Sequence, residues 1–119
     1  MTSLEMAKKI AGILDSKRAT DLSVLEIGKV TSLGDYFVVA SAGSTTQVKA
    51  LADEVDMQLS KAGFEPKRIE GYQTSTWILM DYYDVMVHIF NEETREFYAL
   101  DRLWADAPRI DISDIIVVE

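Results

Sequence analysis

His88 is the chain's only histidine and the first residue to consider as a metal ligand or acid–base group. It lies in DVMVHIF, whose alternating apolar residues are typical of a β-strand. In an extended strand Asp84 and His88 share one face but lie roughly 13 Å apart, too far to coordinate one ion. Asp81 could approach across a hairpin, yet one histidine with scattered carboxylates is a weak metal signal. The sequence therefore predicts no metal site and favours a packing or contact role for His88.

Ser44 is a second candidate, because nucleotidyltransferases often place Gly-Ser at a helix start and hold a divalent metal with later strand-borne aspartates. Here the later acids Asp53 and Asp56 fall inside a predicted helix, and a helix cap explains Ser44 without catalysis. The chain has no cysteine nucleophile and no Gly-x-Ser-x-Gly, phosphate-loop or dinucleotide motif. We predict no enzyme, no catalytic residue and no cofactor. The alternative is a divergent magnesium-dependent nucleotidyltransferase that uses Asp81 or Asp84.

The charge of the chain bears on the class of partner. The formal net charge is −8, and adjacent basic residues occur only as Lys8-Lys9, Lys17-Arg18 and Lys67-Arg68. Nucleic-acid binders normally cluster Lys and Arg against phosphates, so little direct RNA contact is expected. A basic protein partner fits better. No segment resembles a membrane span or a secretory signal, so a cytoplasmic protein is expected.

The elements that position these residues follow from apolar periodicity. A helix is predicted over 3–16, where Thr2 and Glu5 have capping-box spacing. A second helix starts at Ser44, which with Gln47 has the same spacing, and ends at Gly63. Strands are predicted over 22–27, 35–42, 67–71, 76–82 and 85–90. The first two strands are expected to pair antiparallel, and the last two are joined by a tight turn at 83–84.

A third helix is predicted between Glu92 and Pro108. Phe97, Leu100, Leu103 and Trp104 form its core-facing stripe, and Tyr98 lies outside that stripe. The tail over 111–119 is interpreted as a weak strand. The order of elements predicts one α/β domain over 1–119, with a mixed β-sheet flanked by helices. Either the helices cover both sheet faces, or one face stays open as a docking surface that presents Trp77, His88 and Phe90.

The stretch GYQTSTWILMDYYDVMVHIFNEETREFYALDRLWADAPRI, residues 71–110, resembles the ribosomal silencing factor family, also called RsfS or Iojap. The features in common are Gly then Trp, Asp before a turn, V-x-V-H-I-F, R-E-F-Y and L-W-x-D-A-P. DYFVVASAGSTTQVKALADEV also resembles the second strand and long helix of the family. The resemblance covers about 3–110 and leaves 111–119 as a variable tail. Tyr83 departs from the family, which often has Gly at that turn.

The resemblance implies a nucleotidyltransferase-like topology without established transferase activity. It implies binding to the large ribosomal subunit through the ribosomal protein numbered fourteen. Occupying that site blocks joining of the small subunit and represses translation under nutrient shortage. The implied partner-binding residues are Trp77, Asp81, His88, Phe90 and Tyr98, with Asp81 pairing with a cation of the partner. Trp104 is expected to be structural. Some members self-associate, so a homodimer of the free protein is a further expectation, and a module that works by homodimerisation is a third alternative.

Overall fold

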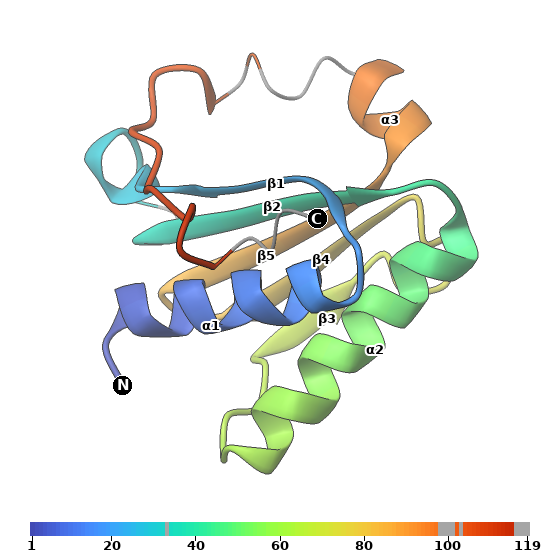
Figure 1. Ribbon diagram of the computed structural model, residues 1–119, viewed down its shortest axis with the longest axis horizontal. Helices are drawn as coiled ribbons and strands as arrows, with labels where there is room; N and C mark the ends of the chain where they lie inside the picture. Colours follow the sequence, from blue (N-terminus) through green and yellow to red (C-terminus); the bar gives the residue numbers. More distant parts are fainter. Residues whose placement is uncertain (33, 98–101, 103, 116–119) are drawn as a thin grey trace.

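The computed structural model describes residues 1–32, 34–97, 102 and 104–115. Its five-stranded sheet has the order β1-β2-β5-β4-β3 (Figure 1). β2 and β5 are parallel, and the other neighbours are antiparallel. The strands are β1 (Thr20–Leu25), β2 (Tyr36–Ala42), β3 (Arg68–Glu70), β4 (Trp77–Tyr82) and β5 (Val85–Asn91). The predicted α/β fold with a mixed sheet is confirmed, and the strand order is compatible with a nucleotidyltransferase-like topology.

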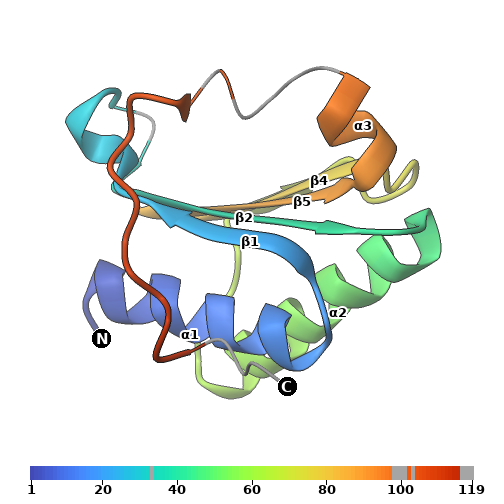
Figure 2. The same cartoon turned by 45° about the horizontal axis from the view of Figure 1, so that its top comes forward.

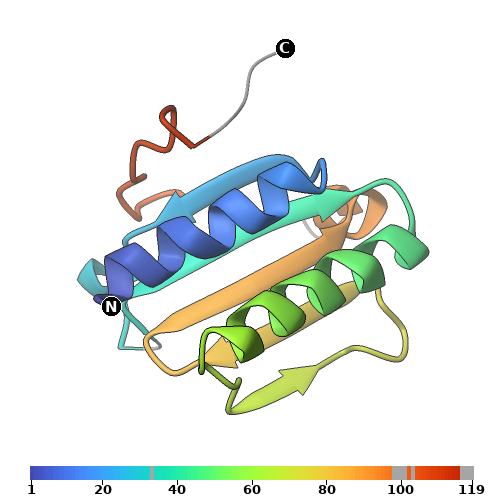
Figure 3. The ribbon, with the colours of Figure 1, turned by 60° about the horizontal axis from the view of Figure 1, so that its bottom comes forward.

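The two long helices, α1 (Ser3–Ser16) and α2 (Thr45–Lys61), lie side by side on one face of the sheet (Figures 2 and 3). We call this the first face. The predicted capping box at Thr2 and Glu5 is present in full. At α2 only half of it forms: the Ser44 hydroxyl accepts from the Gln47 N–H at 3.1 Å, but the Gln47 side chain accepts from Gly43. Among the described residues no helix is long and apolar enough to cross a membrane.

The first face carries the larger hydrophobic cluster. The helices bury apolar stripes against alternate residues of the strands, as helical and strand periodicity require. From α2 these are Val48, Leu51, Ala52, Val55 and Leu59; from β4 and β5 they are Ile78, Met80, Tyr82, Val85, Val87 and Ile89. The other side chains of β4 and β5 therefore point to the opposite face, which we call the second face.

The second face is covered by shorter pieces of chain. The six-residue helix α3 (Glu92–Phe97) lies at one end of it, and residues 104–110 run along the β1 edge (Figures 1 and 2). The Glu26 N–H donates to the Pro108 carbonyl and the Ile110 N–H to the Val24 carbonyl, both at 2.8 Å. These bonds hold the 104–110 segment on the β1 side of the sheet, far from β3.

The third helix is the main error of the sequence prediction. Among the described residues it ends at Phe97, and Phe97 is 80% exposed instead of being core. The α3 residue that faces the sheet is Arg95, which is 8% exposed and donates to the Asp21 carbonyl and the Ser41 hydroxyl, each at 2.8 Å. Phe97 follows by two positions and so points roughly the opposite way. Leu100 and Leu103 of the predicted stripe, and Tyr98, lie outside the described residues.

The predicted tail strand is also wrong over 111–115. Residues 113–115 form a turn in which the Ile115 N–H donates to the Ile112 carbonyl at 2.9 Å. Ile112 is buried in the first-face cluster and Ile115 packs against it. The β-branched residues of this segment therefore serve packing beside α1 rather than sheet pairing. The remainder of the tail, 116–119, lies outside the described residues.

Candidate partner-binding site on the second face

Strand register brings most of the predicted site residues together. In the β4–β5 hairpin Trp77 pairs with Phe90, and Asp81 pairs with Met86. Directly paired residues share a face, and alternate residues along each strand do the same. The side chains on the second face from these strands are Trp77, Leu79, Asp81, Met86, His88 and Phe90. Four of the five predicted contact residues therefore share this face: Trp77, His88 and Phe90 are neighbours, and Asp81 lies further along β4, beyond Leu79. Tyr98, the fifth, lies outside the described residues.

Aromatic rings fill the centre of this face. The Trp77 and Phe90 ring centroids are 4.9 Å apart, and those of Phe37 and His88 are 4.5 Å apart. Trp104 closes the group from the 104–110 segment, 5.4 Å from His88 and edge-on to Phe37 at 5.6 Å. Such ring pairs add to the stabilisation from buried area. We call these five residues the aromatic cluster.

Exposure separates the members of the aromatic cluster. Phe90 is 0% exposed and His88 is 6% exposed, whereas Trp77 is 38% exposed. A partner that docks on this face therefore meets Trp77 directly, and Phe90 supports Trp77 from below. Trp104 is partly buried against the second-face hydrophobic cluster, in agreement with the structural role expected for it.

His88 is held as a neutral ring. The Trp77 indole N–H donates to Nδ1 of His88 at 3.1 Å. Because an indole N–H is a donor only, Nδ1 must carry the lone pair and Nε2 the proton. Burial lowers the pKa of His88 from 6.5 to about 4. Buried Nε2 has no hydrogen-bond partner within the part of the chain that the structure describes. The imidazole is therefore an uncharged hydrogen-bond acceptor packed inside the aromatic cluster at neutral pH.

Asp81 is engaged within its own chain. Its Oδ1 accepts from the Tyr83 N–H at 2.8 Å, and its Oδ2 lies 3.6 Å from Nε of Arg68 on β3. The Asp81 side chain is 8% exposed. Tyr83 has a φ of +71°, the left-handed conformation that favours glycine, and its hydrogen bond to Asp81 supports this turn. A cation of a partner would have to compete with Arg68 for Asp81.

Gly71 is a residue whose structural role the sequence prediction missed. A Cβ at Gly71 would lie 2.1 Å from the Trp77 carbonyl oxygen, and Gly71 has a φ of +78°. The loop over 71–76 therefore passes directly against the start of β4. Its last residue, Thr76, accepts from the Asn91 N–H at 2.9 Å. The signal was the Gly that precedes Trp77 by six residues, which only the family pattern singles out.

The covering of the second face is uneven. Trp104 and Ala107 pack over the β1–β2 side, against Phe37 and its neighbours. On the β4–β3 side Leu79 is partly exposed and the β3 residues Arg68 and Glu70 are exposed. We call this β4–β3 side, with Trp77 at its edge, the open half. The open half combines the apolar side chains of Trp77 and Leu79 with the charged side chains of Arg68 and Glu70.

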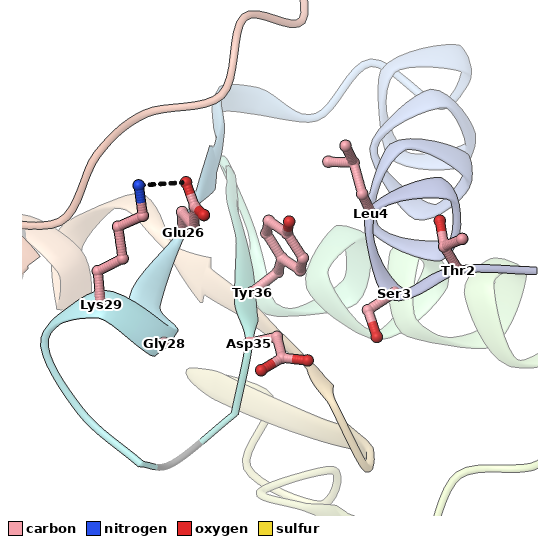
Figure 4. Close-up of a pocket in the computed structure, with 8 residues that line it drawn as sticks. All are labelled: Thr2, Ser3, Leu4, Glu26, Gly28, Lys29, Asp35 and Tyr36. Atoms are coloured by element: carbon pink, nitrogen blue, oxygen red, sulfur yellow. Dashed lines mark ion pairs between the residues drawn. The ribbon is translucent and has the colours of Figure 1, made fainter.

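A cavity elsewhere in the fold has a different character. It measures about 350 Å³ and lies between the start of α1, the turn after β1 and the start of β2 (Figure 4). Lys29 forms an ion pair with Glu26 there, Nζ to Oε2 3.7 Å, and Asp35 adds another carboxylate. None of the predicted contact residues lines it. Over the described residues, no group of three His, Asp or Glu side chains is arranged to hold a metal ion.

Comparison with known proteins gives a consistent result. A family model described as "Ribosomal silencing factor during starvation" matches residues 1–119. Ribosomal silencing factor RsfS of Bacillus subtilis is 36% identical over 112 residues, which cover 94% of this chain and 95% of that protein. RsfS of Halalkalibacterium halodurans is 33% identical, with 98% and 99% covered. A more distant relative, 29% identical and matched over 43% of its length, is the mouse protein named "Mitochondrial assembly of ribosomal large subunit protein 1".

Comparison of the fold with solved structures agrees with the comparison of sequences. A crystal structure of a protein from Chromobacterium violaceum superposes with a TM-score of 0.84 at 34% identity, with 88% of each chain covered. The bacterial relatives are named as ribosomal silencing factors. The chain belongs to the ribosomal silencing factor family, RsfS.

Proposed function

We propose that this protein binds the large ribosomal subunit through the ribosomal protein numbered fourteen and blocks joining of the small subunit. Translation is thereby repressed under nutrient shortage. The observation that carries the proposal is Trp77, a 38% exposed tryptophan beside the open half of a sheet face. Tryptophan is among the residues most enriched in interface hot spots. Family membership supports the ribosome as partner, and the name of the mouse relative supports the large subunit.

The net charge favours a protein as the anchor rather than RNA. A chain with a formal charge of −8 is repelled by the phosphates of ribosomal RNA and attracted to a basic ribosomal protein. On α3 the exposed charges are Glu92, Glu93 and Glu96, whereas Arg95 is turned inward. The proposed site of action is the cytoplasm, where ribosomal subunits join.

The proposed mechanism needs no chemical step and no cofactor. Bound protein occupies surface that the small subunit requires, so inhibition follows from affinity and bulk alone. Trp77 would insert into the partner, with Phe90 and His88 beneath it as its support. Asp81 and Tyr98 complete the proposed contact set, Asp81 through a cation of the partner. The free protein forms a homodimer in this proposal, which light scattering over a dilution series tests.

Co-sedimentation with separated ribosomal subunits tests the proposal. Wild-type protein should travel with large subunits, not with small subunits, and should lower the yield of joined ribosomes. Trp77→Ala should weaken binding about 30-fold or more, the loss typical of a hot-spot residue. Met57→Ala is the matched control, because Met57 is a 45% exposed apolar residue on α2, on the other side of the sheet.

Circular dichroism and thermal unfolding of both variants separate lost contact from lost fold. Wild-type protein that sediments alone at stoichiometric excess over large subunits would overturn the proposal. Equal binding by Trp77→Ala and wild type would remove the second face as the docking site. Loss of binding in Met57→Ala alone would move the site to the helical side of the sheet.

A further inference from the structure

Trp77 has a polar anchor on the neighbouring strand. The Trp77 and His88 side chains are diagonal neighbours on the second face, because Trp77 pairs with Phe90 and Leu79 with His88. The indole N–H donates to His88 Nδ1 at 3.1 Å, with ring centroids 6.0 Å apart. An exposed tryptophan without such an anchor samples several rotamers, and binding a partner then costs entropy. The hydrogen bond selects one orientation of the indole before the partner arrives.

His88 can select that orientation because its own ring is fixed. It is stacked against Phe90 at an interplanar angle of 7°, and Phe37 and Trp104 contact it from other directions. The ring is 6% exposed. A ring packed on these sides cannot turn to offer Nε2–H in place of the Nδ1 lone pair without breaking several contacts. Within the described residues Nε2 has no partner, so in that part of the chain the Trp77 bond is the side-chain hydrogen bond to this ring.

We propose that His88 is a positioning residue: its Nδ1 lone pair fixes the indole of Trp77 in the orientation that docks on the ribosomal partner. The inference rests on the proposed function, since it requires Trp77 to contact the partner. His88 itself stays below the interface and acts through Trp77. Removing the acceptor should release the indole and weaken binding by about 3- to 10-fold, the effect of mobilising one interface side chain.

Two substitutions at His88 separate the acceptor from the volume. His88→Asn keeps an acceptor close to the position of Nδ1. His88→Leu has a side chain of similar size, but that side chain is apolar and has no acceptor. The direct readout is hydrogen exchange of the Trp77 indole N–H by NMR, assigned as the indole resonance that disappears in Trp77→Phe. We expect slow exchange and near wild-type affinity for His88→Asn. For His88→Leu we expect faster exchange and the 3- to 10-fold loss of affinity.

A double-mutant cycle distinguishes positioning from general packing. Trp77→Phe keeps a ring but loses the donor, so His88→Leu should cause no further loss of affinity in that background. If His88→Leu weakens binding equally in both backgrounds, the effect is packing and the proposal is overturned. Wild-type affinity for His88→Leu overturns it as well. If His88→Leu does not fold, His88→Gln replaces it, because its acceptor lies one bond too far to meet the indole.

The two levels of inference fail in different ways. If wild-type protein does not co-sediment with large subunits, the proposed function fails and the docking role of His88 fails with it, even where the indole N–H is protected. If wild-type protein binds and the His88 variants bind equally well, only the positioning role is overturned.

Discussion

The ionisation of His88 gives the sharpest test of the structure, because it is the only histidine in the chain. Burial lowers the pKa of His88 from 6.5 to about 4, so between these values the unfolded chain binds a proton that the folded protein does not. Stability from the neutral ring is therefore fully present above pH 6.5 and is lost as the pH falls towards 4. At 1.36 kcal/mol for each pH unit, the interval corresponds to about 3 kcal/mol.

His88→Asn isolates this contribution from that of the carboxylates. Asp81 and the other acids are present in both proteins, so their titration largely cancels in the difference between the two free energies of unfolding. We expect that difference, wild type minus variant, to fall by about 3 kcal/mol between pH 7 and pH 4. Urea unfolding followed by circular dichroism at several pH values measures it. Titration of the single histidine ring by NMR should give a pKa of about 4 in the folded protein.

The result that would refute this reasoning is a folded-state pKa for His88 at or above 6.5. The imidazole would then be solvated or paired with an acid, and it could not lie as a neutral acceptor inside the aromatic cluster. A pH-independent difference between the unfolding free energies of wild type and His88→Asn would also refute it. Such a result would mean that folding leaves the proton affinity of His88 unchanged.

Two further predictions concern the backbone and the buried arginine. Gly71→Ala should destabilise the protein by about 2–4 kcal/mol in urea unfolding, because it adds a clash with the Trp77 carbonyl to a φ of +78°. Gly63→Ala, with a φ of +90° and nothing within 4 Å, should cost only about 1 kcal/mol; equal losses would contradict the close approach. Arg95→Met should cost about 1–3 kcal/mol because it leaves the buried Ser41 hydroxyl without this donor, and Arg95→Lys should cost less; a neutral Arg95→Met would mean that α3 is held by other contacts.

The parts of the fold that the sequence predicted are those in which one physical pattern decides the outcome. The stripe from Val48 to Leu59 leaves only one way to bury α2, and Gly63, with a φ of +90°, follows the end of that helix where a left-handed residue was expected. The alternation Trp77, Leu79, Asp81 likewise determines which side chains of β4 share a face. The sequence alone could not say which face the helices would cover. That depends on connections over long separations, such as the parallel pairing of β2 with β5.

The third helix was mispredicted because apolar periodicity assigns charge to the solvent side. Arg95 contradicts that rule, since its Nη1 donates to two oxygen acceptors, one on β1 and one on β2, below the surface. Those acceptors come from residues 54 and 74 positions away, so no local pattern identifies them. With Arg95 turned inward, Phe97 must turn outward. Two residues of the candidate site could not be predicted for the same reason. Phe37 contacts His88 and Gly71 contacts the Trp77 backbone only once the sheet has formed.

The position of the proposed docking surface follows from the uneven distribution of helices. α1 and α2 both lie on the first face, so among the described residues α3 and the 104–110 segment are what covers the second face (Figure 2). The 104–110 segment is tied to β1 by backbone hydrogen bonds, which keep it away from β3 and β4. The aromatic cluster is therefore covered on the β1–β2 side. On the β4–β3 side it reaches solvent through Trp77. The covered part surrounds His88 with aromatic rings, and the exposed part carries the Trp77 indole that donates to it. In the proposed function, which depends on occupancy alone, this geometry would present one ordered indole to the partner.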